Sequence, residues 1–412
     1  MDSVIVVGAS LSGWRATEAL RAEGFTGTIT LIGEERHLPY DRPPLSKQVL
    51  AGTWPPEKAV LADKKRSSEL QVHEVLGRRA VRLDVDDRAV ETDDGTVLSA
   101  DGIVLATGAA PRRLPGTELL TPRDGLFTLR TLDDSLALRA AVTAVDEARV
   151  VVIGAGFIGS EVASTCATLG CRVTVLEIMD VPLSNVLGPL VGRHCASLHG
   201  ANGVELRAGV KVAGIERAEA VDGDLRSGLT VCLVDDEVLE ADVVVVGIGV
   251  APSTHWLEGS DLELDDGVVC DDSLYVADGI VAAGDMARWL WRHDKFEEFI
   301  RIEHWEVAAN AGLAAARSLL AGRKDAPPFT PVPYFWSDQY GIRFQVLGNP
   351  GGEDDMEIVD GSFEEGKFVA LYGRAGRLRA AFAIGKPRQL MRYRPLLQAG
   401  CSWDDALTHA AS

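Results

Sequence analysis

The amino-acid sequence predicts an α/β protein with two parallel sheets, followed by a smaller α+β domain at the C-terminus. Three observations lead to this fold class. Runs of β-branched residues alternate with helical stretches along most of the chain. A glycine-rich turn follows a strand-like run twice, starting at Gly8 and at Gly154, which indicates an internal duplication. The proline-rich segment 326–333 cannot continue a helix or a central strand, so it predicts a linker.

The strands expected in the parallel sheets are short runs rich in valine, isoleucine and leucine. They are residues 3–7, 28–32, 102–106, 149–153, 172–176, 242–246 and 279–282. Beyond the linker, further runs are separated by glycine-containing turns, which is typical of an antiparallel sheet. These runs are residues 344–347, 368–372 and 378–384.

Composition excludes several classes of protein. At 412 residues the chain is long enough for two or three domains. It carries 41 Lys and Arg against 61 Asp and Glu, a formal net charge of -20, so nucleic acid is not expected as a partner. The longest apolar run, residues 243–251, is too short to span a bilayer, and no basic segment precedes the first apolar run. We therefore expect a cytoplasmic protein that does not enter a membrane.

The cysteines show no spacing typical of a redox dithiol or a zinc site, so we expect reduced thiols and no metal. They are Cys166, Cys171, Cys195, Cys232, Cys270 and Cys401.

The second glycine-rich turn has the pattern of a dinucleotide-binding Rossmann unit. Gly154 permits a tight turn, Gly156 lets the backbone approach a pyrophosphate, and Gly159 allows close packing of helix on strand. A helix that begins at Phe157 would direct its free N–H groups at the phosphates. Glu177, at the end of the next strand, can hold the ribose hydroxyls. This carboxylate would repel a 2′-phosphate, and residues 178–192 contain no Lys or Arg, so NADH is favoured over NADPH.

The first turn repeats this arrangement with one departure from the pattern. Gly8 and Gly13 occupy the outer glycine positions, while Ser10 occupies the middle one. Two acidic residues, Glu34 and Glu35, close the following strand, so either could hold the ribose of the nucleotide. The sequence thus predicts two Rossmann-like dinucleotide-binding domains in one chain.

Residues 38–47 read LPYDRPPLSK and resemble the signature of FAD-dependent NADH:ferredoxin reductases of bacterial oxygenase systems, such as putidaredoxin reductase and biphenyl dioxygenase reductase. Further landmarks of that family follow in the family's order. They are ATGAAP at 106–111, LRTLDD at 129–134, AAGD at 282–285, EHW at 303–305, FWSDQ at 335–339 and PRQ at 387–389.

The resemblance implies a glutathione-reductase-like flavoprotein with three domains. The FAD-binding domain would comprise residues 1–112 and 243–325, the NAD-binding domain residues 113–242, and a C-terminal interface domain residues 326–412. FAD and NADH would be the cofactors.

The resemblance also assigns cofactor-binding residues. For FAD it implies Gly8, Ser10 and Gly13 at the pyrophosphate, Glu34 (or Glu35) at the ribose, Arg42 at the phosphates, Val81 at the adenine, Ala106, Thr107 and Gly108 at the chain crossover, Asp285 at the ribityl chain, and Trp305 and Trp336 at the isoalloxazine. For the nicotinamide dinucleotide it implies Gly154, Gly156, Phe157, Gly159, Glu161 and Glu177, and Arg130, Ile158 and Gly249 complete the cofactor-binding set.

Lys47 and Glu161 are the two candidate catalytic residues. Lys47 ends the flavin signature and Glu161 lies in the NAD turn, so the resemblance implies that they pair beside flavin N5 and the nicotinamide. The alternative is that both are solvated surface charges, as most lysines and glutamates are.

The electron acceptor is expected to be a small iron-sulfur ferredoxin. Disulfide reductases, coenzyme A disulfide reductases and NADH peroxidases of related fold need a cysteine near the flavin, but this chain has none before Cys166. The region 366–403 contains no Asp or Glu, and part of it could dock an acidic carrier. The candidate patch is Lys386, Arg388, Arg392 and Arg394. Alternatively, these cations solvate a sheet face or pair with acids elsewhere.

Two other functions stay open at this point. The chain could be an NADH oxidase that reduces oxygen directly, or a redox-sensing flavoprotein that resembles apoptosis-inducing factor. The aromatic segment 286–299 departs from the family and has no assigned role. The sequence names neither the ferredoxin nor the terminal oxygenase, its substrate or the oligomeric state.

Overall fold

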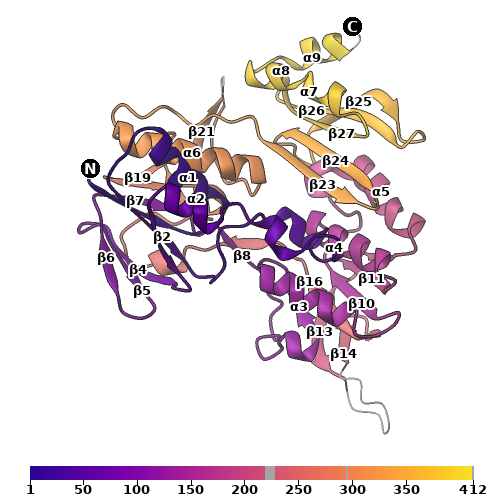
Figure 1. The fold of residues 1–412 in the computed structure, drawn as a ribbon. Helices are drawn as coiled ribbons and strands as arrows, with labels where there is room; N and C mark the ends of the chain where they lie inside the picture. The colour runs from indigo at the N-terminus through magenta and orange to yellow at the C-terminus, as the bar shows by residue number, and fades with distance from the viewer. Residues whose placement is uncertain (219–227, 294–295, 411–412) are drawn as a thin grey trace. The chain divides into compact units, whose positions relative to one another are not determined.

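The computed structural model describes residues 1–218, 228–293 and 296–410. The chain forms two compact units. Figure 1 shows the ribbon coloured by residue number from the N-terminus to the C-terminus. The first unit consists of Met1–Asp41, Ala59–Ala110 and Ala251–Phe335, and the second of Arg42–Lys58, Pro111–Val250 and Trp336–Ser412.

The first unit is built on a six-stranded sheet with the order β19-β20-β7-β1-β2-β3. Its strands are β1 (Ser3–Val7), β2 (Thr28–Gly33), β3 (Val72–Leu76), β7 (Gly102–Leu105), β19 (Tyr275–Ala277) and β20 (Ile280–Ala282). β1 runs parallel to both of its neighbours, β2 and β7. Helices α1 (Leu11–Ala22) and α6 (Trp305–Ala321) pack against each other beside this sheet (Figure 1). The valines and isoleucines of the central strands are buried, which explains their continuous apolar runs.

Two small sheets complete the first unit. One consists of β4 (Ala80–Asp84), β5 (Ala89–Thr92) and β6 (Val97–Ser99). The other is mixed, because β18 (Val268–Cys270) runs parallel to β21 (Ala287–His293), which is antiparallel to β22 (Phe296–Ile300). The aromatic segment without an assigned role thus forms a β-hairpin. Trp289 of this hairpin is 1% exposed and packs on Phe329, with ring centroids 5.3 Å apart. The segment therefore contributes to the core of the first unit.

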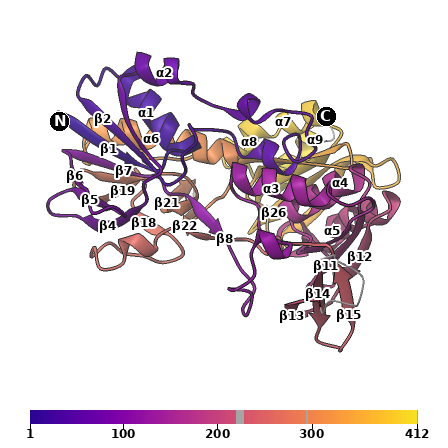
Figure 2. The same ribbon diagram turned by 60° about the horizontal axis from the view of Figure 1, so that its bottom comes forward.

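The second unit contains a five-stranded sheet with the order β12-β11-β10-β16-β9. Its strands are β9 (Leu126–Phe127), β10 (Arg149–Ile153), β11 (Arg172–Glu177), β12 (Glu205–Ala208) and β16 (Val243–Val246), and its helices are α3 (Leu132–Val142), α4 (Phe157–Thr168) and α5 (Ser184–Ala201). Helix α5 is interrupted at Gly188, which has a φ of 73°. A separate antiparallel sheet, seen in Figure 2, consists of β13 (Val212–Arg217), β14 (Leu229–Leu233) and β15 (Val238–Ala241).

The C-terminal part of the second unit is an antiparallel sheet with the order β23-β24-β27-β26-β25. Its elements are β23 (Tyr334–Gln339), β24 (Ile342–Gly348), β25 (Asp355–Ser362), β26 (Lys367–Arg374), β27 (Arg377–Ile384), α7 (Pro387–Met391), α8 (Arg394–Gln398) and α9 (Trp403–Ala410). The three short helices contact β27 (Figure 1). Together with the two parallel sheets, this domain confirms the predicted fold class.

The remaining elements are short. They are α2 (Lys64–Glu69), β8 (Ala109–Pro111), β17 (Val250–Pro252) and the 3-10 helices Pro43–Ser46, Pro56–Ala59, Pro122–Asp124, His255–Leu257 and Gly284–Met286. No helix within the described ranges is long and apolar enough to cross a membrane.

The two compact units do not coincide with the three predicted domains, whose bounds stay a prediction, and two segments illustrate the difference. We predicted that the FAD-binding domain resumes at residue 243, but β16 pairs with β10, so the chain remains in the second unit until Val250. The segment Arg42–Lys58, predicted in the FAD-binding domain, also belongs to the second unit. Its 3-10 helix is held there because Ser135 Oγ donates to Leu45 O (2.7 Å) and Thr165 Oγ1 donates to Ser46 O (2.7 Å).

The β21–β22 hairpin gives a test of this fold. Trp289→Ala should lower the free energy of unfolding by about 3–5 kcal/mol, because it removes a fully buried indole. Phe299→Ser, on the same hairpin, should change it by less than about 1 kcal/mol, because Phe299 is 45% exposed. Denaturant unfolding measures both variants, and equal effects would show that the hairpin is not part of the core.

Candidate active site

The glycine turn of the second unit has the geometry that a dinucleotide-binding loop needs. Gly154 has a φ of 102°, and a Cβ there would lie 2.4 Å from Gly247 O. A Cβ on Gly159 would lie 2.0 Å from Gly154 O, so only glycine allows helix α4 to approach the turn. Gly156 faces open space, with no atom within 4 Å of a Cβ, and precedes the free N–H groups of α4. The turn thus leaves room for a pyrophosphate at the helix N-terminus.

The first unit repeats this turn. Gly8 has a φ of 122°, and a Cβ there would lie 2.1 Å from Ala106 O. A Cβ on Gly13 would lie 1.9 Å from Gly8 O. Ser10 is the N-cap of α1 with a φ of -125°, a conformation that any residue adopts, and its hydroxyl makes no capping hydrogen bond. A serine is therefore compatible with the middle position, where its hydroxyl can donate to a phosphate oxygen.

The acidic residues after the two turns differ by one position. Gly8 N donates to Ile32 O (2.8 Å), as Gly154 N donates to Leu176 O (2.7 Å), so Gly33 occupies the place of Glu177. Glu34 therefore lies one residue beyond the equivalent position.

The surroundings of these carboxylates also differ. Glu177 is 9% exposed and accepts hydrogen bonds from Ala155 N (2.7 Å) and Met179 N (2.9 Å), which fix its orientation. Glu34 is exposed, while Glu35 accepts a hydrogen bond from the hydroxyl of Tyr40. Glu34 thus has the freer carboxylate of the two alternatives for the ribose.

Glu161, on helix α4 after the second unit's glycine turn, accepts four hydrogen bonds. It is only 2% exposed, and its carboxylate accepts hydrogen bonds from Ser46 Oγ (2.5 Å) and Lys47 Nζ (2.7 Å). Its other oxygen accepts from Ser337 Oγ (2.8 Å) and from Asp338 N (3.2 Å). Glu161 and Lys47 therefore form an ion pair in the second unit and are not solvated surface charges. Their place beside the flavin and the nicotinamide stays a prediction.

Three partners of Glu161 could not be inferred from the sequence as ligands of this carboxylate. Ser46 precedes Lys47 in the flavin signature, and Ser337 and Asp338 lie in the FWSDQ landmark on β23. The sequence singled out these residues only as members of motifs, because a serine hydroxyl has no spacing pattern that reveals its hydrogen-bond partner. The structure shows that these motifs meet at one buried carboxylate.

The crossover residues of the first unit are joined by hydrogen bonds. Thr107 Oγ1 donates to Ser253 O (2.8 Å), and Ser253 N donates to Gly108 O (2.9 Å). Gly108 has a φ of 70°, which favours glycine at this position. The segments that leave and re-enter the first unit are thereby held together next to the end of β7.

The landmarks Gly284-Asp285 and Glu303-His-Trp305 lie beside helices α1 and α6. A Cβ on Gly284 would lie 2.4 Å from Ser12 Oγ, which itself donates to Ala308 O (2.8 Å). Trp305 begins α6, and its indole N–H donates to Asp41 Oδ1 (2.8 Å). Burial raises the pKa of Asp41, and the Trp305 hydrogen bond opposes that rise. Asp41, which was not among the predicted site residues, thus links the flavin signature to the start of α6.

His304 precedes Trp305 as the N-cap of α6. Its ring stacks on Phe335 with a centroid separation of 5.0 Å. Burial lowers the pKa of His304 to about 4, although Asp285 opposes the shift. The imidazole is therefore neutral near pH 7, and it does not compete with the positive end of the α6 dipole for an anionic ligand.

The predicted cofactor residues are distributed over both units. The first unit contains Gly8, Ser10, Gly13, Glu34, Glu35, Val81, Ala106, Thr107, Gly108, Asp285 and Trp305. The second contains Arg42, Lys47, Arg130, Gly154, Gly156, Phe157, Ile158, Gly159, Glu161, Glu177, Gly249 and Trp336. Within the second unit, the guanidinium of Arg42 donates to Arg130 O, which joins two of them directly. Val81 lies on β4 and is 37% exposed, so its adenine contact stays a prediction.

The two turns fit the groups that the sequence predicts for them. Each offers outer turn positions that only glycine can occupy, a helix N-terminus and an acidic residue at the end of the second strand or just beyond it. FAD would be held by the first turn and a nicotinamide dinucleotide by the second.

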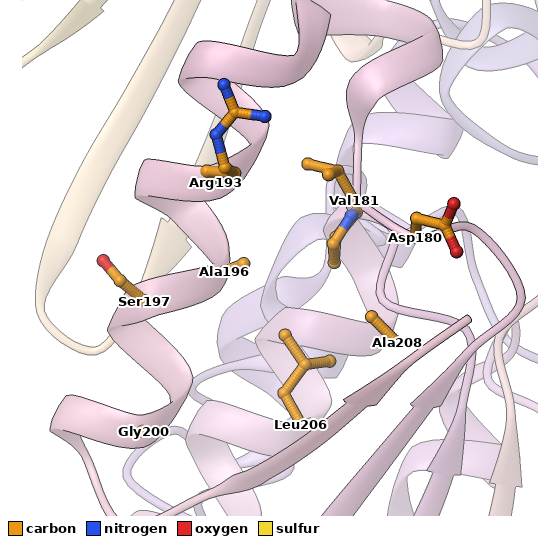
Figure 3. A pocket seen from close by; sticks show the side chains of 9 residues that line it. Asp180, Val181, Arg193, Ala196, Ser197, Gly200, Leu206 and Ala208 are labelled. Carbon is orange, nitrogen blue, oxygen red and sulfur yellow. The ribbon is translucent and has the colours of Figure 1, made fainter. Parts of the chain in front are cut away.

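A pocket of about 470 Å³ lies beside the loop that follows Glu177. Figure 3 shows Arg193, Ala196 and Ser197 on α5 at one side and Asp180 with Val181 at the other. Arg193 is the first basic residue after Glu177 in the sequence, and Asp180 shares its pocket. The pocket lining contains no second cation that would compensate a 2′-phosphate.

The first unit contains one cysteine, Cys270, and its environment does not favour a reactive thiolate. Cys270 is buried, and its thiol donates to Val268 O (3.3 Å). Burial raises its pKa well above the usual range, so the thiolate is not accessible. The other cysteines all belong to the second unit, with Cys166 the first in the chain.

Comparison with known proteins shows the family of the chain. Residues 2–312 match the family model described as pyridine nucleotide-disulphide oxidoreductase, and residues 334–411 match the model described as reductase C-terminal. The ferredoxin reductase component of chlorobenzene dioxygenase from Cupriavidus sp. (strain PS12) is 35% identical over 408 residues, covering 98% of this chain and 94% of that protein.

Two further relatives agree with these matches. The anthranilate 1,2-dioxygenase system ferredoxin–NAD(+) reductase component of Burkholderia cepacia is 36% identical over 413 residues, covering 98% of this chain and 96% of that protein. The crystal structure of a covalent putidaredoxin reductase–putidaredoxin complex has a TM-score of 0.89 at 29% identity, covering 100% of this chain and 98% of that chain.

Two alanine variants test the second turn. Gly156→Ala should fold normally, because its Cβ meets no atom within 4 Å, but the methyl group would obstruct the pyrophosphate. We expect NADH to bind at least about tenfold more weakly, or roughly 1.4 kcal/mol. Gly159→Ala should instead destabilise the fold by about 1–3 kcal/mol through overpacking. Titration with NADH and thermal unfolding separate the two effects, and wild-type NADH affinity in Gly156→Ala would contradict the assignment.

Proposed function

The chain belongs to the pyridine nucleotide-disulphide oxidoreductase family, and we propose that it is an FAD-dependent NADH:ferredoxin reductase that supplies electrons to an oxygenase. The family resemblance predicted from the motifs is confirmed by these matches. The observation that carries the proposal is the buried Lys47–Glu161 pair, which joins the flavin signature to the helix of the NAD turn. FAD and NAD(H) are the cofactors that the family implies.

Bound FAD would supply the chemistry, since its ring accepts a hydride from NADH and releases electrons one at a time. The residues of the chain would bind the two cofactors, orient their reacting rings and exclude water. Glu161 holds Lys47 in one orientation, with the ammonium side chain 12% exposed. We place this pair where the nicotinamide meets the flavin. There the fixed ammonium of Lys47 would orient the reacting rings. The buried carboxylate of Glu161 would balance the charge of that ammonium, which would otherwise attract water.

The lack of any cysteine before Cys166 supports a one-electron acceptor. The single cysteine of the first unit is buried and protonated, so no disulfide can accept electrons there. The relatives named ferredoxin reductase components support a small ferredoxin as this acceptor. A cytoplasmic location remains a prediction from the sequence.

The docking patch is proposed at helix α7 and its flanks. Arg388 and Arg392 are exposed, and Met391 between them is 37% exposed. Lys386 is already paired with Asp360 (2.6 Å), and Arg394 is only half-exposed at the start of α8. The two exposed arginines are therefore the main candidates for contact with an acidic ferredoxin, and Met391 offers an apolar contact at their centre.

The ion pair is tested by Glu161→Gln. The variant leaves the ammonium of Lys47 without its carboxylate, so the reacting rings lose a fixed neighbour. Anaerobic rapid mixing with NADH should show flavin reduction slowed by about 10- to 100-fold, while FAD content stays unchanged. Glu147→Gln is the matched control, because Glu147 forms an exposed pair with Arg172 that contributes little. Equal rates in both variants would refute a role for Glu161 in hydride transfer.

Glu177 should determine the choice of nucleotide. Glu177→Ala removes the buried carboxylate that would repel a 2′-phosphate, so the preference for NADH over NADPH should fall by about tenfold, or roughly 1.4 kcal/mol. The ratio of kcat/KM for the two nucleotides measures this change. An unaltered ratio would mean that another residue discriminates against NADPH.

The docking patch is tested by the double variant Arg388→Glu/Arg392→Glu. Charge reversal should raise the apparent KM for ferredoxin by about tenfold or more at low salt, and the effect should shrink as ionic strength rises. Flavin reduction by NADH should not change. Lys65→Glu, on the exposed face of α2, gives the same kind of charge change in the other unit. A similar KM increase in that control would attribute the effect to net charge.

A further inference from the structure

Helix α4 ends in a motif that brings two cysteines together. The helix ends at Thr168, and Gly170, with a φ of 86°, reverses the chain. Gly170 N donates to Ala167 O (3.0 Å) and Cys171 N donates to Cys166 O (3.0 Å). This is the hydrogen-bond pattern of a Schellman motif, which places the side chains at the two outer positions in contact. Here those two positions are Cys166 and Cys171.

The two thiols interact with each other in contrasting environments. Cys166 is fully buried in the core of the second unit, and Cys171 is half-buried at the start of β11, where its thiol also points to Val142 O (3.7 Å). The hydrogen bond between the thiols raises the pKa of Cys166, and burial raises it further. The same hydrogen bond lowers the pKa of Cys171, against the effect of burial. Cys171 is thus the thiol that ionises first and that an oxidant can reach.

We propose that Cys166 and Cys171 form a reversible disulfide when the protein meets hydrogen peroxide. Cys171 as thiolate attacks one peroxide oxygen, so that an S–O bond forms, the O–O bond breaks and hydroxide leaves. The sulfur of Cys166 then attacks the sulfenic sulfur of Cys171. The S–S bond forms, the S–O bond breaks, and the Cys166 proton leaves with the oxygen as water. In total two thiols lose two electrons, and peroxide is reduced to two molecules of water.

The position of the pair separates this reaction from electron transfer. The cysteines lie at the C-terminal end of α4 and the N-terminal end of β11, while Glu161 and Glu177 lie toward the opposite ends of these elements. Helix α4 has 12 residues and so is roughly 18 Å long. The disulfide closes only the helix–strand turn and leaves both nucleotide turns intact. Its formation should therefore protect Cys171 from further oxidation without stopping flavin reduction by NADH.

Peptide mapping after peroxide treatment tests the proposal on the intact protein. Trypsin releases residues 150–172 as one peptide, because no Lys or Arg occurs between Arg149 and Arg172, and this peptide contains both cysteines and no others. After brief peroxide treatment, unfolding and alkylation, the peptide should be lighter by two hydrogen atoms and should resist alkylation until dithiothreitol is added. Peptides that contain the buried Cys195 and Cys270 should remain alkylatable, which provides an internal control.

Single variants identify the order of events. In Cys166→Ser, Cys171 should gain one or more oxygen atoms, because no partner thiol removes the sulfenic acid. In Cys171→Ser, the buried Cys166 should remain a thiol. Alkylation of both cysteines in the peroxide-treated wild type, or gain of oxygen on its peptide in place of hydrogen loss, would overturn the proposal. Either result would leave the reductase assignment untouched, since flavin reduction by NADH is measured separately.

Discussion

The arrangement of the second unit depends on one buried carboxylate. Glu161 has lost almost all contact with water, which costs several kcal/mol unless hydrogen bonds and an opposite charge replace the hydration shell. Lys47, two serine hydroxyls and a backbone N–H supply that replacement. They come from the flavin signature and from β23 of the C-terminal domain, so two segments that lie far from Glu161 in the sequence converge on it. Removing any one of them would leave a buried charge incompletely solvated.

The same requirement explains why the signature segment belongs to the second unit although it follows the first glycine turn. Ser135 and Thr165 hold the 3-10 helix that precedes Lys47, and only in this position can Lys47 reach Glu161. A segment that would otherwise be a surface connection is thus fixed against the helix of the NAD turn.

The sequence predicted the periodic parts of the fold well. Strands β1 and β10 begin and end where their apolar runs do, because both faces of these strands are buried. The valine run at 243–246 looks the same in either sheet, and only its pairing with β10 decides that it belongs to the second unit. Strand β25 was missed because it is an edge strand whose residues are mostly half-exposed and include three acids, so it has no continuous apolar run.

The candidate site was predictable where backbone geometry restricts the residue type. At the outer positions of the glycine turns a Cβ would lie less than 3 Å from another atom. Only glycine fits there, and this requirement leaves a clear sequence pattern. The partners Ser46 and Ser337, and the contact between Cys166 and Cys171, depend on tertiary packing or on a helix ending, for which a serine or cysteine at a given spacing gives no signal. The Lys47–Glu161 pair was found only because two separate motifs each contained one of its members.

The most direct test of the central claim is the electron balance between NADH and a two-iron ferredoxin under anaerobic conditions. The flavin-loaded protein is mixed with limiting NADH and excess oxidised ferredoxin. The absorbance of the flavin and that of the ferredoxin are followed over time. Our account predicts rapid flavin reduction and two ferredoxin molecules reduced for each NADH consumed. Flavin that is reduced by NADH but leaves ferredoxin oxidised, and that only oxygen can reoxidise, would contradict it.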